Sequence, residues 1–159
     1  MMESMNIIPL DVLPADIPSI DEDVNDIINS FPEIQFKAME IEIFRDLCGN
    51  NNLITWDPQD IINFFKTPGI IISGCIPDIK LSMLETNAVI AAQFNTVQIK
   101  NIKKIMFCVY GTAESLNSYG RLMNFCVKFL PTEIEILSGL IDDKNTEKDS
   151  YTLKYIAIC

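Results

Sequence analysis

The sequence predicts an α+β domain in which helices pack against a four-stranded sheet. Two observations predict this fold class. Four short segments have the composition of strands, and they alternate with segments whose apolar residues recur at helical spacing. Apolar residues also make up 48% of the 159 residues, which is enough to form a core without disulfides or metals. We therefore expect one sheet with helices packed against it.

The four predicted strands lie in the last two thirds of the chain. They are "GIIISGCI" (69–76), "KKIMFCVYG" (103–111), "EIEILSGLIDD" (133–143) and "YTLKYIAIC" (151–159). The first two are short apolar runs, which are typical of buried strands. The last one alternates apolar and polar residues and follows the polar turn "DDKNTEKDS". It is therefore predicted to pair with 133–143 as a hairpin.

Five helices are predicted around these strands. They cover "IDEDVNDIINSF" (20–31), "PEIQFKAMEIEIFRDLCGNN" (32–51), "WDPQDIINFFKT" (56–67), "PDIKLSMLETNAVIAAQF" (77–94) and "AESLNSYGRLMNFCVKFL" (113–130). A proline stands at or near the start of three of them, a position that helices tolerate. The part "MEIEIF" of the second helix also alternates, so a strand is compatible with it.

The acidity of the chain belongs to its N-terminal third. Residues 1–50 hold eleven acids against Lys37 and Arg45, a net −9 of the formal −10. Three prolines within residues 1–20 favour an extended arm over a helix. The sequence therefore predicts an acidic N-terminal arm with a short helix over 1–35, followed by an α+β domain over 36–159.

Charge and residue types exclude several classes of function. An acidic chain without a basic stripe is a poor nucleic-acid binder, because it cannot neutralise phosphates. No segment is apolar over the length that membrane insertion needs, and no signal peptide is recognisable. The chain has no histidine, and its five cysteines show no C-x-x-C spacing, so a metal site has no ligand set. Scattered cysteines in apolar surroundings favour reduced thiols and a cytoplasmic location.

The segment "NLITWDPQDI" (52–61) places two carboxylates three residues apart around a proline. Asp57 can cap the following helix, and Asp60 in the first turn favours the helix dipole. The same two acids can also point at a group outside the chain. Trp56 beside them is either a core anchor or a contact residue of an interface.

Three stretches of the chain resemble the C-terminal domain of the FtsZ/tubulin family. Residues 52–61 are similar to the family loop typically read as "GLINVDFADV", with Asp57 and Asp60 at its two acids. Residues 102–130 are similar to "AKGVLVNITGGEDLTLFEVNEAAEIV", and residues 132–159 to "ANIIFGAVIDDSLGDEIRVTVIATG". The resemblance covers about residues 36–159 and is clear from residue 52 onward. It implies the fold of the FtsZ C-terminal domain.

The resemblance also implies a role for the loop 52–61. In the family, this loop completes the GTPase site of the neighbouring subunit along a filament, and its acids orient the attacking water. It therefore implies Asp57 and Asp60 as catalytic residues in trans, and Asn52, Thr55 and Trp56 as interaction residues. Asn52 and Thr55 replace the family's glycine and asparagine.

The resemblance implies a bacterial cell-division protein whose loop docks on the nucleotide face of an FtsZ-type subunit, or one that associates with itself. The six glycines of the chain are scattered, so it has no phosphate-binding loop of its own. GTP is then expected only from a partner subunit, and the chain alone is not expected to be an enzyme. The alternative is a regulatory α+β module that binds a small molecule, or a dimerisation module, with no FtsZ partner.

Overall fold

The computed structural model describes residues 20–49, 52–54, 56–80, 101–112, 116–128, 130–131, 133–143, 146 and 150–159. The helices within these ranges are α1 (Ile20–Asn29), α2 (Ala38–Leu47), α3 (Pro58–Phe64) and α5 (Leu116–Val127). The strands are β1 (Asn52–Ile54), β2 (Ile71–Lys80), β3 (Lys104–Gly111), β4 (Glu135–Asp142) and β5 (Ser150–Ile158). The predicted arm over 1–19 lies outside the described residues.

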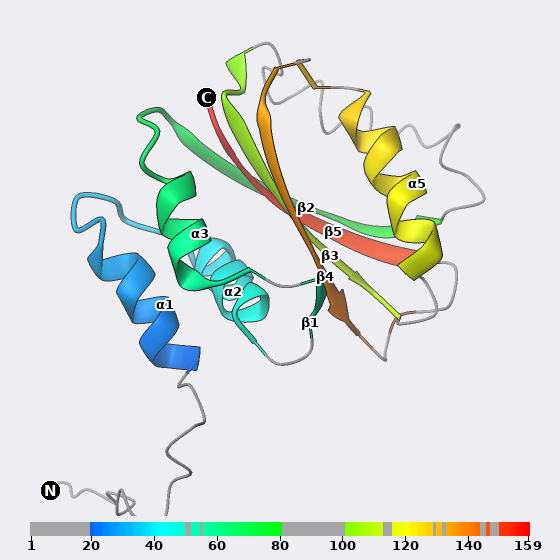
Figure 1. Cartoon of the computed structure of the whole chain (residues 1–159), viewed down its shortest axis with the longest axis horizontal. Helices are drawn as coiled ribbons and strands as arrows, with labels where there is room; N and C mark the ends of the chain where they lie inside the picture. The colour runs from blue at the N-terminus through cyan, green and yellow to red at the C-terminus, as the bar shows by residue number, and fades with distance from the viewer. Residues whose placement is uncertain are drawn as a thin grey trace, which may run out of the picture.

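The strands form one mixed sheet in the order β1-β4-β3-β5-β2 (Figure 1). β3 runs parallel to β4, and all the other pairs are antiparallel. The α+β class is therefore confirmed. The four predicted strands are all present, and β1 is a fifth strand that the sequence did not indicate. Its three residues are too few to show an alternating pattern.

The predicted hairpin between the last two strands is wrong. β3 lies between β4 and β5, so that Cys108 stands opposite Gly139 on one side and Lys154 on the other. β4 and β5 run in opposite directions as expected, but a reversal of the chain does not make two strands neighbours. β3 is the most apolar strand, with seven of its eight residues buried, and it takes the central position, where both edges are paired.

The helix predicted from Pro77 is also corrected by the structure. β2 continues to Lys80, with a bulge between Ile76 and Ile79. Proline is accepted at a bulge because the ladder is locally interrupted there. Asp78, the residue after the proline, has a φ of 57°, a left-handed conformation that is uncommon for a side chain-bearing residue. Residues 81–94 of the predicted helix lie outside the described part of the chain.

Helices cover both faces of the sheet (Figure 1). α5 packs one face, where Tyr119, Leu122 and Cys126 join an apolar cluster with residues of β2, β3 and β5. α1, α2 and α3 pack the other face, and their buried residues form a second cluster with alternate residues of the same strands. Successive strand residues point to opposite faces, so each buried strand contributes to both clusters.

The N-terminal helices share one aromatic centre. Phe44 of α2 and Phe65 at the end of α3 are in edge-to-face contact, with ring centroids 5.5 Å apart. Phe31, which follows α1, contacts Phe65 at 6.0 Å. α1 therefore packs into the same core as α2 and α3, while the domain boundary at residue 35 stays a prediction.

α2 begins later than the sequence indicated. The predicted helix starts at residue 32, whereas α2 starts at Ala38, after Lys37 donates its backbone N–H to Glu40 Oε1 at 2.9 Å. Glu40 is only 2% exposed, and its Oε2 accepts a hydrogen bond from Ser73 Oγ at 2.8 Å. This carboxylate thus caps α2 and ties it to β2. The helical prediction for "MEIEIF" is confirmed.

Candidate functional site

The loop 52–61 is joined to the rest of the fold at its start. β1 pairs with β4, with Asn52 opposite Ile141 and Ile54 opposite Leu140. Asn52 Nδ2 donates a hydrogen bond to the backbone oxygen of Leu47, the last residue of α2. The position of the loop is therefore set by both the sheet and α2. Thr55 lies outside the described residues.

Trp56 anchors the middle of the loop. Its indole Nε1 donates a hydrogen bond of 2.7 Å to the backbone oxygen of Ser138 on β4. The half-buried ring packs at the margin of the cluster beneath α1–α3. A buried indole N–H normally needs such an acceptor. Trp56 is thus an anchor of the loop, and its predicted role as a contact residue stays a prediction.

Asp57 and Asp60 cap α3 reciprocally. Asp57 Oδ1 accepts a hydrogen bond from the backbone N–H of Asp60 at 2.9 Å, and Asp60 Oδ2 accepts one from the N–H of Asp57 at 3.3 Å. Pro58 occupies the first helical position, where its missing N–H costs nothing. The predicted cap by Asp57 is confirmed, and Asp60 lies in the first turn as predicted and also takes part in the cap. Their catalytic role is untested and stays a prediction.

The cap leaves a second oxygen on each acid. Within the described part of the chain, Asp57 Oδ2 and Asp60 Oδ1 take no part in the cap bonds. Asp57 is exposed and Asp60 is half-buried. The arrangement therefore holds two carboxylates side by side at the N-terminal end of α3. Each is fixed through one oxygen and can accept hydrogen bonds through the other.

A polar network lies between α2 and the sheet, and its residues were not among the predicted site residues. Tyr110 of β3 donates its hydroxyl hydrogen to Asp46 Oδ2, and Lys154 of β5 pairs with Glu42. The Lys154 ammonium also stands over the Tyr110 ring, 4.6 Å from its centroid. The partners are 64 and 112 residues apart in sequence, so no local pattern could reveal them.

Burial sets the protonation of this network. Desolvation raises the pKa of Asp46, against the opposing effects of the Tyr110 hydrogen bond and the Lys154 charge. Desolvation also disfavours the Lys154 ammonium, but the hydrogen bond and the charge of Glu42 outweigh it, so the pKa of Lys154 is raised. Burial raises the pKa of the Tyr110 hydroxyl as well. The network therefore keeps Lys154 charged and Tyr110 protonated, as hydrogen-bond donors toward α2.

Two of the five cysteines are core residues, and the other three are half-buried. All five are unpaired, and Cys108 and Cys126 are fully buried. Burial raises the pKa of both thiols to about 12. For Cys48, near the loop, burial and then the charges of Asp23 and Asp57 raise the pKa to about 12. These thiols are therefore protonated at neutral pH and are poor nucleophiles.

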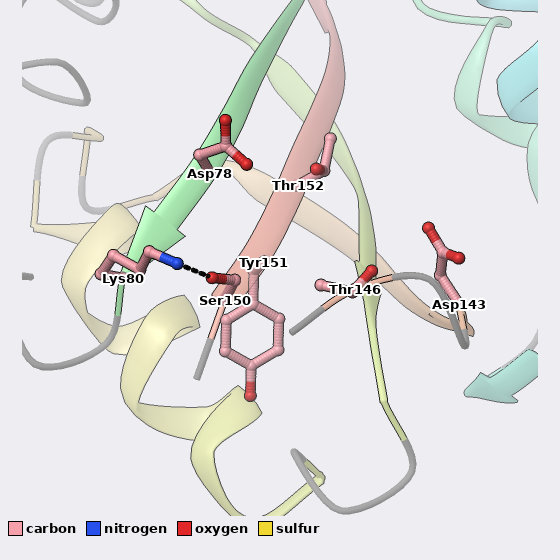
Figure 2. Close-up of a pocket in the computed structure, with 7 residues that line it drawn as sticks. All are labelled: Asp78, Lys80, Asp143, Thr146, Ser150, Tyr151 and Thr152. Carbon is pink, nitrogen blue, oxygen red and sulfur yellow. Dashed lines mark hydrogen bonds between the residues drawn. The ribbon is translucent and has the colours of Figure 1, made fainter. Parts of the chain in front are cut away.

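A second candidate site is a polar cavity of about 270 Å³ beside the ends of β2 and β5 (Figure 2). It is lined by Asp78, Lys80, Asp143, Thr146, Ser150, Tyr151 and Thr152. Lys80 Nζ donates a hydrogen bond of 2.5 Å to Ser150 Oγ. The residues that line the cavity thus carry one ammonium, two carboxylates and several hydroxyls. No local sequence pattern reveals this cavity, because its residues come from segments far apart in the chain.

Neither a metal centre nor a membrane span is found in the described ranges. No three Cys, Asp or Glu side chains there come together as possible metal ligands. Among the residues that the structure describes, no helix combines the length and apolar content that crossing a membrane requires.

The comparisons with known proteins show the fold. No protein-family model matches the sequence, and no curated protein matches it either. Among solved structures, FtsZ from M. jannaschii is similar with a TM-score of 0.59 and 15% identity, over 94% of this chain and 44% of FtsZ. TubZ-Bt, solved as a four-stranded filament, is similar with a TM-score of 0.50 and 16% identity, over 87% of this chain and 34% of TubZ. The chain therefore has an FtsZ- and TubZ-like fold and spans less than half the length of either protein.

Proposed function

We propose that this chain is an FtsZ-type C-terminal domain that acts through protein–protein contact in bacterial cell division, in the cytoplasm. Its loop 52–61 docks on the nucleotide face of an FtsZ-type subunit or of a related chain. The shared fold supports this proposal, as do the loop similar to the family's and the coverage of less than half of FtsZ. The proposed counterpart of this chain is the C-terminal part of FtsZ.

One observation carries the proposal: the paired carboxylates of Asp57 and Asp60 lie on a loop that is anchored at its start and at its middle. Trp56 fixes the loop to β4, and Asn52 fixes it to α2. A contact surface that is already ordered loses little conformational entropy on docking. The reciprocal cap also sets the distance between the two acids before any partner arrives.

The chemistry proposed for the two acids is the positioning of water. In phosphoryl transfer, the protein mainly orients the attacking water and manages charge. Asp57 Oδ2 and Asp60 Oδ1 would accept hydrogen bonds from a water molecule beside the γ-phosphate of a nucleotide that the partner subunit binds. The partner would also supply the cations that offset the repulsion between carboxylates and phosphate.

The proposed contact has a consequence for assembly. A head-to-tail filament grows only while each subunit offers both of its faces. The described residues offer a loop face and no phosphate-binding loop. The domain would then act either as the activating half of a split GTPase site or as a cap on a filament end.

The test is the GTP turnover and the pelleted mass of an FtsZ-type protein from the same organism, with and without this chain. The variant to compare is Asp57→Asn/Asp60→Asn, because asparagine keeps an oxygen for each cap bond but removes the charge. We expect the native chain to change turnover or pelleted mass at substoichiometric amounts, and the variant to lose most of the effect on turnover. If neither protein has an effect, the proposal is wrong.

The polar cavity favours a second candidate function, the binding of a small molecule by a regulatory module. Lys80 suits a carboxylate or phosphate group, while Asp78 and Asp143 suit an amine. A thermal-shift screen with amino acids and nucleotides tests this candidate. A ligand that raises the Tm of the native chain but not of an Asp78→Asn/Asp143→Asn variant would support it, and no shift with any of them would count against it.

A further inference from the structure

β2 forms one margin of the sheet, and the backbone groups along its outer side can be assigned. Ile70, just before β2, exchanges two backbone hydrogen bonds of 2.9 Å with Cys159, just after β5. In an antiparallel ladder, alternate residues point their N–H and C=O groups to the same side. The backbone groups of Ile72 and Gly74 therefore point toward β5, and those of Ile71, Ser73 and Cys75 point away from the sheet.

Within the described residues, this outer edge carries neither charge nor proline along β2 up to Ile76. Exposed edges commonly carry charged residues or proline, which prevent pairing with another strand. Residues 69–76 contain neither. Ile70 is 71% exposed, more than Val127 at 41% or Leu53 at 37%, the other exposed large hydrophobic residues in the described ranges. Protection begins only at Pro77 and Asp78, where the bulge lies.

We propose that the outer edge of β2 pairs antiparallel with the same edge of a second copy of this chain, to form one continuous sheet across a two-fold axis. Such an interface is isologous, so the strand must be complementary to itself. With the axis at Ser73, Ser73 stands opposite the partner's Ser73, and Ile71 stands opposite the partner's Cys75. The outward N–H and C=O groups of Ile71, Ser73 and Cys75 are then all paired.

The side chains fit this register. Ile72 stands opposite the partner's Gly74, so a large side chain meets a residue that has none. A Cβ added to Gly74 would lie 2.5 Å from the Tyr155 hydroxyl oxygen, so the glycine makes room for the buried Tyr155 ring of its own chain. Ile70, which is exposed in the single chain, stands opposite the partner's Ile76. Opposite residues share a face of the sheet, so the α5 helices of both copies lie on one side.

A second copy suits this edge better than a charged peptide does. Residues 69–76 offer no charge to select such a peptide, and self-pairing needs only the strand itself. β1 lies at the opposite margin of the sheet from β2. Pairing through β2 therefore leaves the loop 52–61 accessible, and this inference does not depend on the proposed function.

The first test is sedimentation equilibrium of the purified chain, with Ile70→Lys as the variant and Val127→Lys as its control. Both substitutions replace an exposed apolar residue with lysine, but only the first lies at the edge. We expect the native chain to reach twice its 18.0 kDa mass as concentration rises, Ile70→Lys to weaken the dimer about tenfold or more, and the control to leave it unchanged. A chain that stays monomeric, or a dimer that Ile70→Lys does not weaken, overturns the inference.

The second test is a disulfide that reports the register. In an Ile71→Cys variant, the new cysteine would stand about 5.5 Å, Cα to Cα, from the partner's Cys75, which suits a disulfide. Within one chain these positions are four strand residues apart, about 13 Å, which is too far for a bond. We expect a reducible dimer after mild oxidation of Ile71→Cys and none after oxidation of Ile71→Cys/Cys75→Ser. Equal crosslinking of the two variants, or none in either, overturns the register.

Discussion

The two faces of the sheet are built by different interactions. Beneath α5, the described residues form an apolar cluster, with Phe107 and Leu153 from the strands and Leu122 from the helix among the buried residues. Beneath α2, the alternate residues of the same strands include Tyr110 and Lys154, which bond to carboxylates of the helix. Both faces use non-directional burial, and on the α2 face directional polar contacts also join the helix to the strands.

This difference shows how one set of contacts can supply most of the free energy of folding while another fixes the position of a helix. Apolar contacts supply most of the free energy of folding but tolerate small shifts of a helix. Hydrogen bonds and ion pairs weaken steeply when their partners move apart or turn away, so they favour one position of the helix. α2 ends at Leu47, whose carbonyl oxygen binds Asn52 at the start of the loop 52–61. The polar face therefore fixes the helix that carries the candidate functional loop.

Removing a large side chain from the apolar face should have the largest effect. Phe107 is fully buried at the centre of the cluster under α5. We expect Phe107→Ala to lower the free energy of unfolding by about 3–5 kcal/mol, because it leaves a cavity that its neighbours cannot fill. Urea unfolding followed by circular dichroism measures the change. A loss below about 1 kcal/mol would mean that this face is not the main source of stability.

The carboxylate of Glu40 tests the polar contacts between α2 and β2. Glu40→Ala leaves the Lys37 N–H and the Ser73 hydroxyl without their acceptor, and we expect a loss of about 2 kcal/mol. Glu40→Gln keeps one acceptor oxygen and should lose less. Urea unfolding of both variants gives the comparison, and equal losses for the two would show that packing, not hydrogen bonding, decides the effect.

Trp56 tests the anchor of the loop itself. Trp56→Phe keeps an aromatic ring but removes the hydrogen bond to Ser138, and we expect a loss of about 1 kcal/mol. The local effect should exceed the global one, with faster amide exchange in β1 and at the start of α3. Hydrogen-exchange mass spectrometry measures both regions. Unchanged exchange there would mean that β1 pairing alone holds the loop.

Asp46 should give the smallest effect, seen as a pH dependence. Burial raises the pKa of Asp46 above its ordinary value of 3.8, so the folded state holds this proton more tightly than the unfolded state does. Its stabilisation is complete below pH 3.8 and is lost as pH rises through the folded pKa. Asp46→Asn cannot titrate but can still accept the Tyr110 hydrogen bond.

The Tm of Asp46→Asn relative to the native chain should therefore rise as pH increases from about 4 to 7. Thermal melts of both proteins across this range measure the difference. A difference that is flat or falls with pH contradicts the argument that Asp46 is destabilised as a carboxylate.

Local sequence signals identified much of the fold. The apolar runs of β2 and β3 and the alternation of β5 gave the right strands, because burial acts on each segment separately. The cap formed by Asp57 and Asp60 was also predictable, since its residues lie within one turn of helix. The order of the strands was not, because turn residues report a chain reversal and not the pairing across the sheet.

The missed features of the candidate site all depend on distant residues. Trp56 reaches Ser138 across 82 positions, and Tyr110 reaches Asp46 across 64. Pro77 looked like a helix start because proline serves both there and at a bulge. The role of the two acids could not be decided from sequence, because capping and water positioning need the same side chains at the same spacing.

Amide hydrogen exchange of this chain, with and without an FtsZ-type protein bound to GTP, tests the account most directly. We expect binding to slow exchange from Asn52 to Phe64 and to leave exchange in β5 unchanged. Protection confined to other segments, such as the outer edge of β2, or no protection at a concentration where the two proteins co-sediment, would contradict the claim that the loop 52–61 is the contact surface.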